Sequence, residues 1–369
     1  MVVSTAPAAL QAGERIRRLR EAVVEAGLDA FVATSDESIA YLSGFRPLQL
    51  ERLFAVTVHA GSSAAILVPA LDRGQVRDAP DVLTRVSYEA SSDGVAELVA
   101  ALAGARRVGV EGEHLNFARS EALRAAGFEL VSAGHLMDAL RWCKEAGEIE
   151  KVRAACELVE RGVRRVFETL SPGVTEREAN GRVESWLREQ GATAAHPLIL
   201  FGDRAANPHS EPGDRELRVG DVVCADLSAC LDGYWGDLTR CATVGPASDW
   251  ARDAWIVVRE AQAAAIAACR PGISAREVDA AARQLVEARP DLGQCLHGAG
   301  HAIGLAIHEP PFLVPRTQTP LVAGMIFTIE PGIYLPGVGG LRLEDDVLVG
   351  PDGPELLSTP HPELLELSA

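Results

Sequence analysis

Lysine is almost absent from this sequence, and its scarcity excludes two classes of enzyme. The chain has 35 lysine and arginine residues together, but only Lys144 and Lys151 are lysines. A phosphate-binding loop needs a lysine between glycine and serine or threonine, and a Schiff-base enzyme needs a lysine in its pocket. Neither lysine has such a sequence context, so both classes are excluded.

Paired cysteines, a secretion signal and long apolar runs are missing as well. The seven cysteines form an odd set without a Cys-x-x-Cys motif, which is typical of buried, reduced thiols. Residues 1–10 lack the basic and apolar regions of a signal peptide, and no apolar run approaches the ~20 residues that span a bilayer. The sequence therefore predicts a cytoplasmic protein that does not bind membranes.

The charge balance argues against nucleic acid as a partner. The formal net charge is −17 at pH 7, and a chain this acidic does not attract phosphate backbones through its overall field. Hydrophobic residues make up 47% of the 369 residues, which is enough for a sizeable core. A chain of this length and composition is expected to fold into two or three globular domains.

The first 140 residues alternate helix-like and strand-like segments. Residues 12–26 have a helical apolar pattern that stops at Gly27, and short apolar runs follow, the first over residues 29–34. This alternation predicts an α/β domain over residues 1–140. The segment has three histidines and no acidic cluster at ligand spacing, so we interpret it as a scaffold or oligomerisation domain.

The remainder, residues 141–369, continues a helical pattern that runs from 136 to 170 and then contains an internal repeat. Residues 172–178 are echoed by residues 271–277. In both copies Pro-Gly ends one helix, Thr or Ser caps the next, and Glu follows three residues later, as in a capping box. Two ordinary helix starts would also give this pattern. Because each copy precedes strand-like segments, we favour two related halves, and an α/β (α+β) fold with an internal pseudo-two-fold.

Two aspartates share a predicted hairpin. The strand-like segments 222–228 and 235–243 flank an Asp-Gly pair, which is a strong hairpin signal. A turn centred between residues 231 and 232 puts Asp226 opposite Asp237, and a centre one residue further makes them diagonal neighbours. Either register brings the carboxylates within about 5–8 Å, where like charges require a proton or a cation between them. The alternative is a surface hairpin with two solvated aspartates.

Glu330 and Glu344 repeat this arrangement. The strand-like segments 325–330 and 340–349 are joined through a Pro-Gly pair, and a hairpin centred on Gly337 puts both glutamates on one face. A second pair of like charges at the end of an apolar run favours burial over solvation. The sequence thus predicts four acidic side chains that need a common cation.

A histidine-rich stretch lies between the two hairpins. His297, His301 and His308 occur within a glycine-rich and alkyl-rich segment, where three histidines indicate a site more than core packing. Four carboxylates with one or two imidazoles suit two divalent ions such as Mn²⁺, Co²⁺ or Zn²⁺ better than one structural zinc. Two ions ~3.5–4 Å apart would supply hydroxide near neutral pH.

With these motifs the sequence resembles the pita-bread-fold metallopeptidases, in particular their Xaa-Pro branch of prolidases and aminopeptidases P. The first 140 residues are similar to that branch's creatinase-like N-terminal domain, and the rest is similar to its pita-bread catalytic domain. The resemblance implies two divalent ions, with Mn²⁺ as the first choice, and a homodimer. The metal ligands that it implies are Asp226, Asp237, His301, Glu330 and Glu344.

The resemblance also implies roles in catalysis and in substrate binding. His308 matches the family's non-ligand catalytic histidine, and Glu330 would move a proton toward the leaving nitrogen. His209 and His297 match its substrate-facing histidines. Arg342 shares a strand face with Glu344 and is expected either to bind the carboxylate of a dipeptide or to pair with a neighbouring acid such as Glu344 or Asp346.

The expected reaction is hydrolysis of the bond before proline in a small peptide with proline at position 2. An Xaa-Pro dipeptidase (prolidase) is the first hypothesis, and an aminopeptidase P that acts on longer Xaa-Pro peptides is the second. A non-catalytic peptide-binding module on the same fold is a remote third, because such a module would be expected to have lost metal ligands.

Overall fold

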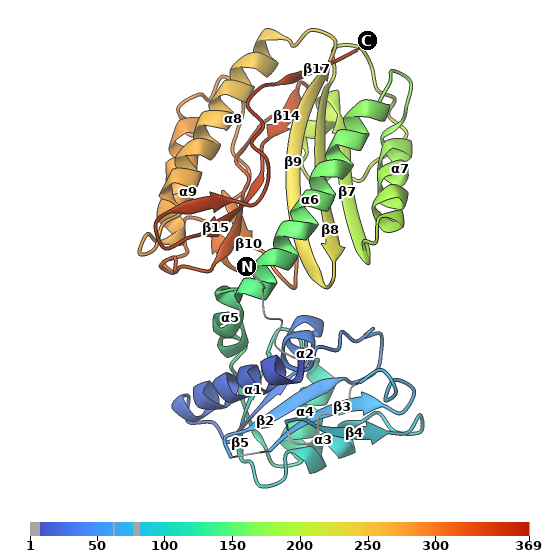
Figure 1. Ribbon diagram of the computed structural model, residues 1–369, viewed down its shortest axis with the longest axis vertical. Helices are drawn as coiled ribbons and strands as arrows, with labels where there is room; N and C mark the ends of the chain where they lie inside the picture. The colour runs from blue at the N-terminus through green and yellow to red at the C-terminus, as the bar shows by residue number, and fades with distance from the viewer. Residues whose placement is uncertain (1–7, 62, 77–81, 369) are drawn as a thin grey trace. The chain divides into compact units, whose positions relative to one another are not determined.

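The structure, a computed structural model, describes residues 8–61, 63–76 and 82–368. It divides into two compact units, an N-terminal unit of residues 1–141 and a C-terminal unit of residues 142–369 (Figure 1). None of the helices in the described ranges combines the length and apolar composition needed to cross a membrane.

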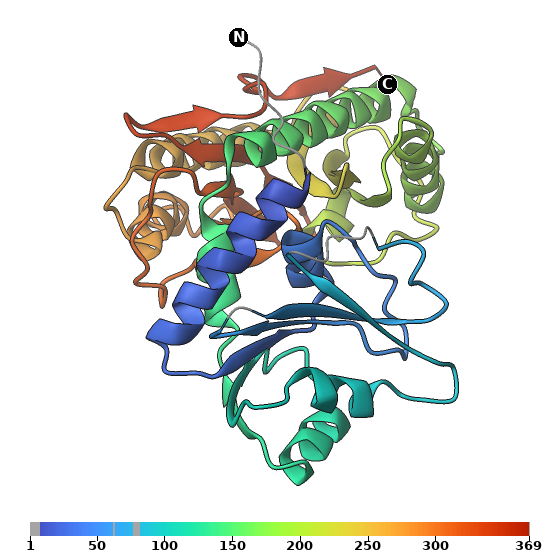
Figure 2. The ribbon, with the colours of Figure 1, turned by 60° about the horizontal axis from the view of Figure 1, so that its bottom comes forward.

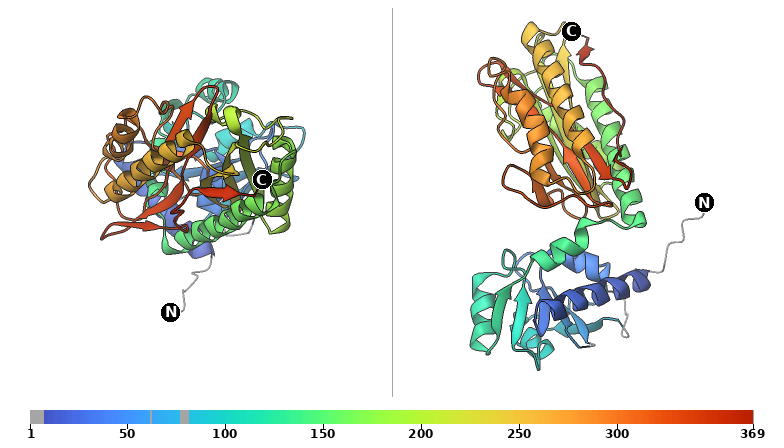
Figure 3. Two further views of the ribbon diagram at one scale, coloured as in Figure 1. Left: turned by 90° about the horizontal axis from the view of Figure 1, so that it is seen from above. Right: turned by 90° about the vertical axis from the view of Figure 1, so that its left-hand side faces the viewer.

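The N-terminal unit is a six-stranded mixed sheet in the order β4-β3-β2-β1-β5-β6, with helices on both of its sides (Figure 3). The pairs β1–β2 and β2–β3 are antiparallel, and the other neighbours are parallel. Its elements are α1 (Ala8–Glu25), β1 (Ala30–Ala33), α2 (Asp36–Ser43), β2 (Ala55–His59), β3 (Ala64–Pro69), β4 (Thr84–Tyr88), α3 (Val95–Ala101), β5 (Arg107–Val110), α4 (Phe117–Ala125), β6 (Glu129–Ser132) and α5 (His135–Trp142).

Local sequence signals explain where these elements end. Gly27 adopts the left-handed conformation with φ 64°, which suits glycine, and the chain turns there from α1 into β1. The helical pattern of residues 136–170 is two helices, not one. Glu145 starts α6 with a capping box, because its backbone N–H donates to Glu148 Oε2 at 2.9 Å while its side chain accepts from the first turn.

The C-terminal unit contains two larger sheets and one short hairpin. The first sheet has the order β17-β9-β8-β7 and the second the order β11-β10-β12-β15-β16, while β13 pairs with β14 alone. The elements are α6 (Ala146–Thr169), α7 (Glu176–Glu189), β7 (Ala194–Phe201), η1 (Gly202–Ala206), β8 (Val222–Leu231), β9 (Tyr234–Val244), α8 (Asp249–Ala268), α9 (Ala275–Glu287), β10 (Gly300–Ala302), β11 (Glu309–Leu313), β12 (Ile326–Ile329), β13 (Gly332–Leu335), β14 (Gly339–Arg342), β15 (Asp345–Val349), β16 (Pro354–Leu356) and β17 (Leu365–Leu367).

Each larger sheet has its own pair of helices. Helices α6 and α7 share a core with β7, β8 and β9, and α6 runs along this sheet (Figures 1 and 2). Helices α8 and α9 share a second core with β10, β12 and β15. The fold is therefore α/β, with two helix-covered sheets in the C-terminal unit.

The two copies of the internal sequence repeat form equivalent hydrogen bonds. Thr175 and Ser274 both form capping boxes, at the starts of α7 and α9. Just before them, Gly173 N donates to Leu217 O and Gly272 N donates to Leu321 O, each at 2.9 Å. The two halves therefore share the same local architecture, a helix start pinned by a returning segment, as expected for an internal pseudo-two-fold.

Candidate metal centre

The first pair of acids lies on the long β8–β9 hairpin. The turn at Asp232 and Gly233, both with positive φ, joins Leu231 directly to Tyr234 across the ladder. In this register Asp226 is opposite Thr239 and Asp237 is opposite Ser228. The two aspartates are thus diagonal neighbours on one face, which is the second of the two predicted registers.

The second pair lies where a long hairpin is interrupted. The ladder pairs Ile329 with Asp345 in β12–β15 and Gly332 with Arg342 in β13–β14, in one continuous register centred on Gly337. The predicted strand 340–349 is split into β14 and β15, while the predicted strand 325–330 ends at the same break, where the chain leaves the ladder between these sheets. Glu330 and Glu344 occupy that break, outside the regular strands on either side of it.

Two histidines complete the arrangement. His301 lies in β10, between β11 and β12, and is buried. The ring of His308, which directly precedes β11, lies 4.1 Å from the ring of His301, centroid to centroid. The segment between the two residues therefore folds back, and both imidazoles reach the same place.

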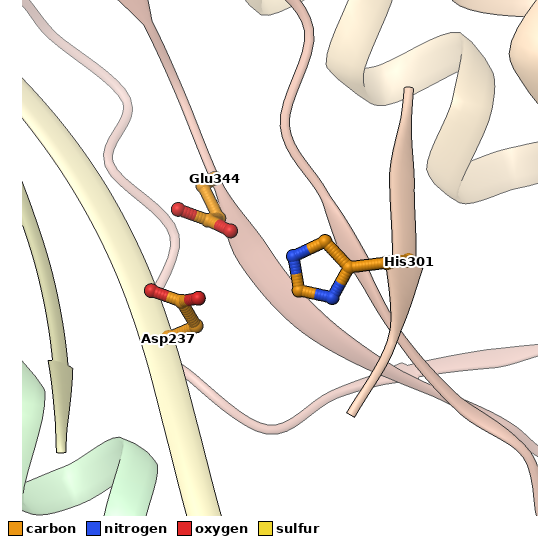
Figure 4. A group of neighbouring side chains, drawn as sticks. All are labelled: Asp237, His301 and Glu344. Carbon is orange, nitrogen blue, oxygen red and sulfur yellow. The ribbon is translucent and has the colours of Figure 1, made fainter. Parts of the chain in front are cut away.

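Asp237, His301 and Glu344 converge in the C-terminal unit. Ligand atoms of the three side chains lie within 4.8 Å of one another, and Figure 4 shows the three groups turned toward a common centre. Glu330 belongs to the same group, because its Oε1 lies 3.4 Å from His301 Nε2. Asp226 is the fifth member, and its negative charge acts on both Asp237 and Glu344.

The electrostatics of these groups are those of a site with more negative than positive charge. Burial, and then repulsion by the other acids, raises the pKa of Asp237 and of Glu344 well above the ordinary carboxyl range. Burial raises the pKa of Glu330 to about 7, although Arg342 opposes the shift. Burial also lowers the pKa of His301 to about 3, so its imidazole is neutral and offers a lone pair.

The residues fit a divalent metal. Among the described residues Asp237 Oδ1 is buried and has no hydrogen-bond partner, a costly arrangement unless a cation is present. Carboxylate oxygens with one neutral imidazole are a donor set that divalent ions such as Mn²⁺ and Zn²⁺ accept. The centre can therefore hold cations, and bound cations would lower the repulsion among its acids.

A hydrogen-bonded chain connects Asp226 to His297. Arg342 Nη2 donates to Asp226 Oδ2 at 2.6 Å, and its Nη1 donates to the Tyr334 hydroxyl at 2.8 Å. The Tyr334 hydroxyl lies 2.6 Å from His297 Nε2, and Arg342 Nε donates to Thr239 Oγ1 at 3.1 Å. Every guanidinium nitrogen of this 3% exposed arginine therefore has a partner within the chain.

This geometry gives Arg342 an acidic partner that the sequence did not name. The sequence suggested that Arg342 binds a substrate carboxylate or pairs with a neighbouring acid such as Glu344 or Asp346. The structure pairs it with Asp226 of the β8–β9 hairpin, and a role toward a substrate carboxylate stays a prediction. The prediction considered only acids close to Arg342 in the sequence, whereas Asp226 lies on β8, a strand of another sheet that contacts β14.

His209 lies in an exposed loop that reaches the same centre. Burial is the main cause that lowers the pKa of His308 and of His297, and the charge of His209 contributes to both shifts. His297 Nδ1 lies 3.9 Å from Glu330 Oε2, and the ring of His308 lies beside that of His301, so these two imidazoles border the acidic cluster. Their roles toward substrate stay predictions.

Sequence reasoning missed several residues around the acids. Thr239 Oγ1 donates to Glu344 Oε2 at 2.7 Å, and Asp346 Oδ2 accepts from Asp237 N at 3.0 Å. Both lie two residues from a proposed ligand, so the period of two along a strand could have placed them on the same face. Tyr334 carried no such signal.

Comparison with known proteins identifies the family. The sequence model of metallopeptidase family M24 matches residues 150–351, and that of the creatinase/prolidase N-terminal domain matches residues 15–143. The chain belongs to metallopeptidase family M24. It is therefore a peptidase, and the candidate metal centre lies within the part that matches the family.

Three similar proteins cover nearly the whole chain. An uncharacterized peptidase of Staphylococcus aureus (strain MSSA476) is 33% identical over 335 residues, which are 89% of this chain and 94% of the relative. The structure of an Xaa-Pro dipeptidase from Bacillus anthracis is 31% identical, covers 96% of this chain and 100% of its own, and has a TM-score of 0.89. That of an X-Pro aminopeptidase from Thermotoga maritima MSB8 is 26% identical, covers 95% and 99%, and has a TM-score of 0.85.

Proposed function

We propose that this M24 peptidase is an Xaa-Pro dipeptidase that uses two divalent metal ions. The observation that carries the proposal is the convergence of Asp237, Glu344 and a neutral His301 from both halves of the C-terminal unit, with Asp237 Oδ1 buried and unpartnered among the described residues. Glu330 lies beside His301, and Asp226 is the diagonal neighbour of Asp237. The similarity to an Xaa-Pro dipeptidase over the full length of that chain supports the choice of substrate.

The proposed ligands divide between the two halves. Asp226 and Asp237 come from the first half, while His301, Glu330 and Glu344 come from the second. When bound to such a set, divalent ions activate a water molecule and polarise the carbonyl group of the scissile bond. Arg342 donates a hydrogen bond to Asp226, and Thr239 donates one to Glu344, so both carboxylates are oriented before any ion arrives.

The side chains around the ligands would perform the remaining steps. His308 lies at the exposed edge of the centre, and burial together with the charge of His209 keeps its pKa below the usual value. A neutral His308 can donate a hydrogen bond to the carbonyl oxygen as negative charge develops there. Glu330 accepts a proton from the attacking water and passes it to the proline nitrogen, which must gain a proton as the C–N bond breaks.

Substrate selection is assigned to the histidines at the edge. The proline nitrogen of an Xaa-Pro bond carries no hydrogen, so the site must recognise the proline ring instead of an amide N–H donor. His209 and His297 are proposed to face the peptide, and His297 is fixed by its contact with the Tyr334 hydroxyl. An aminopeptidase P acting on longer peptides is the second candidate, and the similarity to the Thermotoga maritima enzyme favours it.

Three further features complete the proposal. Mn²⁺ is the proposed metal because its preference for carboxylates suits this donor set. A homodimer is proposed from the family resemblance, with the N-terminal unit (residues 1–140 by the sequence prediction) as scaffold and residues 141–369 as the catalytic part. A cytoplasmic location is proposed from the seven cysteines, which are all free thiols.

Steady-state hydrolysis by the Mn²⁺-loaded protein tests this function. The substrates are an Xaa-Pro dipeptide, the matching Xaa-Pro-Yaa tripeptide and an Xaa-Ala dipeptide. We expect kcat/KM to be highest for Xaa-Pro and the Asp237→Ala variant to be inactive. A preference for the tripeptide would establish the aminopeptidase instead, and no turnover by a protein that retains its metal would contradict both.

A further inference from the structure

The loop that carries His209 is tied at its base by one buried carboxylate. Glu176, the first residue of α7, is 0% exposed. Its Oε2 accepts from Arg204 Nε at 2.8 Å and from Gly213 N at 3.0 Å, and its Oε1 accepts from Phe201 N at 3.0 Å. A single side chain therefore fixes both ends of the segment 204–213, which we call the His209 loop.

Arg204 extends this brace into the loop itself. Its Nη2 donates to Glu211 O at 2.5 Å, on the far side of His209. Between them, Asn207 N donates to Arg204 O at 3.1 Å, and Ser210 N donates to Asn207 O at 2.9 Å. The backbone on both sides of His209 is thus hydrogen-bonded to groups that Glu176 and Arg204 hold in place.

The internal repeat shows that the common architecture does not need this acid. Glu176 is equivalent to Ala275 in the second half, since each follows the capping residue of its helix. Glu176 N donates to Arg215 O at 3.0 Å, and Ala275 N donates to Thr319 O at 2.9 Å, so the pinned helix start is the same. The carboxylate occurs only in the half whose returning segment presents His209.

The braced loop lies against the metal centre. η1, where the loop begins, packs on β14, and a side chain at Gly340 would collide with the backbone carbonyl of Ala205. β14 ends at Arg342, which holds Asp226.

We infer that Glu176 and Arg204 are positioning residues for substrate binding, which hold the His209 loop so that His209 faces the peptide. This inference rests on the proposed peptidase function of the centre and adds to it two residues remote from the ligands. An immobilised His209 is expected to bind the substrate equally well in the ground state and in the transition state. Loss of its fixed position should therefore raise KM more than it lowers kcat.

The test compares Arg204→Gln with Arg177→Gln in the Mn²⁺-loaded enzyme. Arg177 is a matched control, since it pairs through an exposed ion pair of 3.0 Å with Asp214, the residue that directly follows the His209 loop. We expect Arg204→Gln to raise KM for Xaa-Pro about tenfold with unchanged metal content, and Arg177→Gln to change it less than about twofold. Arg204→Lys, which can still pair with Glu176, should restore part of the loss. Equal KM values for the two glutamine variants would overturn the inference.

A double-mutant cycle separates positioning from general destabilisation. If Arg204 acts through His209, Arg204→Gln should have almost no further effect on KM in a His209→Ala background. Full multiplication of the two effects would contradict the inference. Glu176→Gln should follow Arg204→Gln, and Arg204→Gln suffices if the buried substitution prevents folding.

Failure of the proposed function would be distinguishable. If the wild-type protein does not cleave Xaa-Pro, the brace is tested by amide hydrogen exchange over residues 204–213, where Arg204→Gln must exchange faster than Arg177→Gln. An active wild-type enzyme with no difference between the two variants in KM or exchange would refute the inference alone.

Discussion

Buried acids in the N-terminal unit and in the metal centre are treated in opposite ways. Glu111, in the N-terminal unit, is buried, and both of its oxygens are fully occupied. Oε2 accepts from Thr34 N and Ser35 N, and Oε1 accepts from the hydroxyls of Ser35 and Ser38, at 2.5–2.9 Å. Asp237 in the C-terminal unit is equally buried, but its Oδ1 has no partner among the described residues and its neighbours are other acids.

The contrast distinguishes a structural acid from a metal-binding one. Burial alone is not informative, because Asp279 is also buried in the C-terminal unit and is satisfied by Arg283 and by Ala299 N. What separates Asp237 and Glu344 is the excess of negative charge over donors. A folded protein can retain such an excess only if protons or cations lower its cost, because desolvated like charges repel strongly.

The largest effect is expected from Asp237→Asn, with Glu111→Gln as its matched partner. Asp237→Asn should lose more activity than the roughly 10–100-fold cost of removing an outer-shell partner of a metal. It should also raise the unfolding temperature of the metal-free protein, because one repelled carboxylate is gone. Metal analysis, kinetics and thermal unfolding of both variants measure these effects.

Glu111→Gln should behave in the opposite way. It should lower stability by about 1–3 kcal/mol, because an amide cannot satisfy all four donors, and it should leave metal content unchanged. If both substitutions lowered the stability of the metal-free protein, the contrast between the two acids would be wrong.

The next largest effect is expected for His308→Ala. This variant should keep its metal and lose about 10²–10³ in kcat, the usual cost of one donor to a developing oxyanion. Metal content and single-substrate kinetics of the purified variant measure this. Loss of metal would instead make His308 a ligand and would extend the metal-binding group beyond the acids and His301.

Much of the centre could be predicted from sequence because the position of the turn in a hairpin determines which residues lie opposite each other. The Asp-Gly turn placed Asp226 and Asp237 on one face, and only the choice between two registers stayed open. The Gly337 turn gave the register that relates Glu330 to Glu344. Contacts between separate hairpins, such as Arg342 with Asp226, have no such rule, because they depend on how the two halves pack.

Other residues could not be found by pattern at all. Lys144 was set aside by the sequence analysis, yet it is buried and its Nζ lies 3.2 Å from Glu309 Oε2, next to His308. Glu111 and Glu176 received no role from the sequence, since nothing in their neighbourhood signals that distant backbone N–H groups will surround them. The break at Glu344 was missed because strand-like residues lie on both sides of it, within the predicted strand 340–349.

A moderate effect is expected for Arg342→Gln, and it sharpens the view of Arg342 as a holder of Asp226. Because the guanidinium is fully engaged within the chain, kcat/KM should fall by a similar factor, about 10–100-fold, for Xaa-Pro and for Xaa-Pro-amide. A loss confined to the free carboxylate substrate would instead support the prediction that Arg342 binds the C-terminal carboxylate of the substrate.

The smallest effect is a pH dependence of the metal-free protein. Raised carboxyl pKa values, such as about 7 for Glu330 and for Asp346, mean that the folded state binds more protons than the unfolded state, so stability falls as pH rises through them. The lowered pKa values of His301 and His297 act in the opposite sense, but only below about pH 6.5.

Above about pH 6.5 the carboxyl groups determine whether stability rises or falls with pH. The unfolding temperature of chelator-treated protein should decrease between pH 6.5 and 8.5, and less steeply in Glu344→Gln. Saturating Mn²⁺ should reverse the trend, because binding requires the deprotonated acids. A metal-free protein that becomes more stable over this range would contradict the charge excess.

The most direct test is a calorimetric titration of Mn²⁺ into chelator-treated protein, with hydrolysis of Xaa-Pro followed in parallel. The account predicts two equivalents bound per chain with release of protons, activity that returns with occupancy, and loss of this binding in Asp237→Asn. Full activity of the metal-free protein, or equal binding by Asp237→Asn, would show that the unsatisfied acids are not the metal centre.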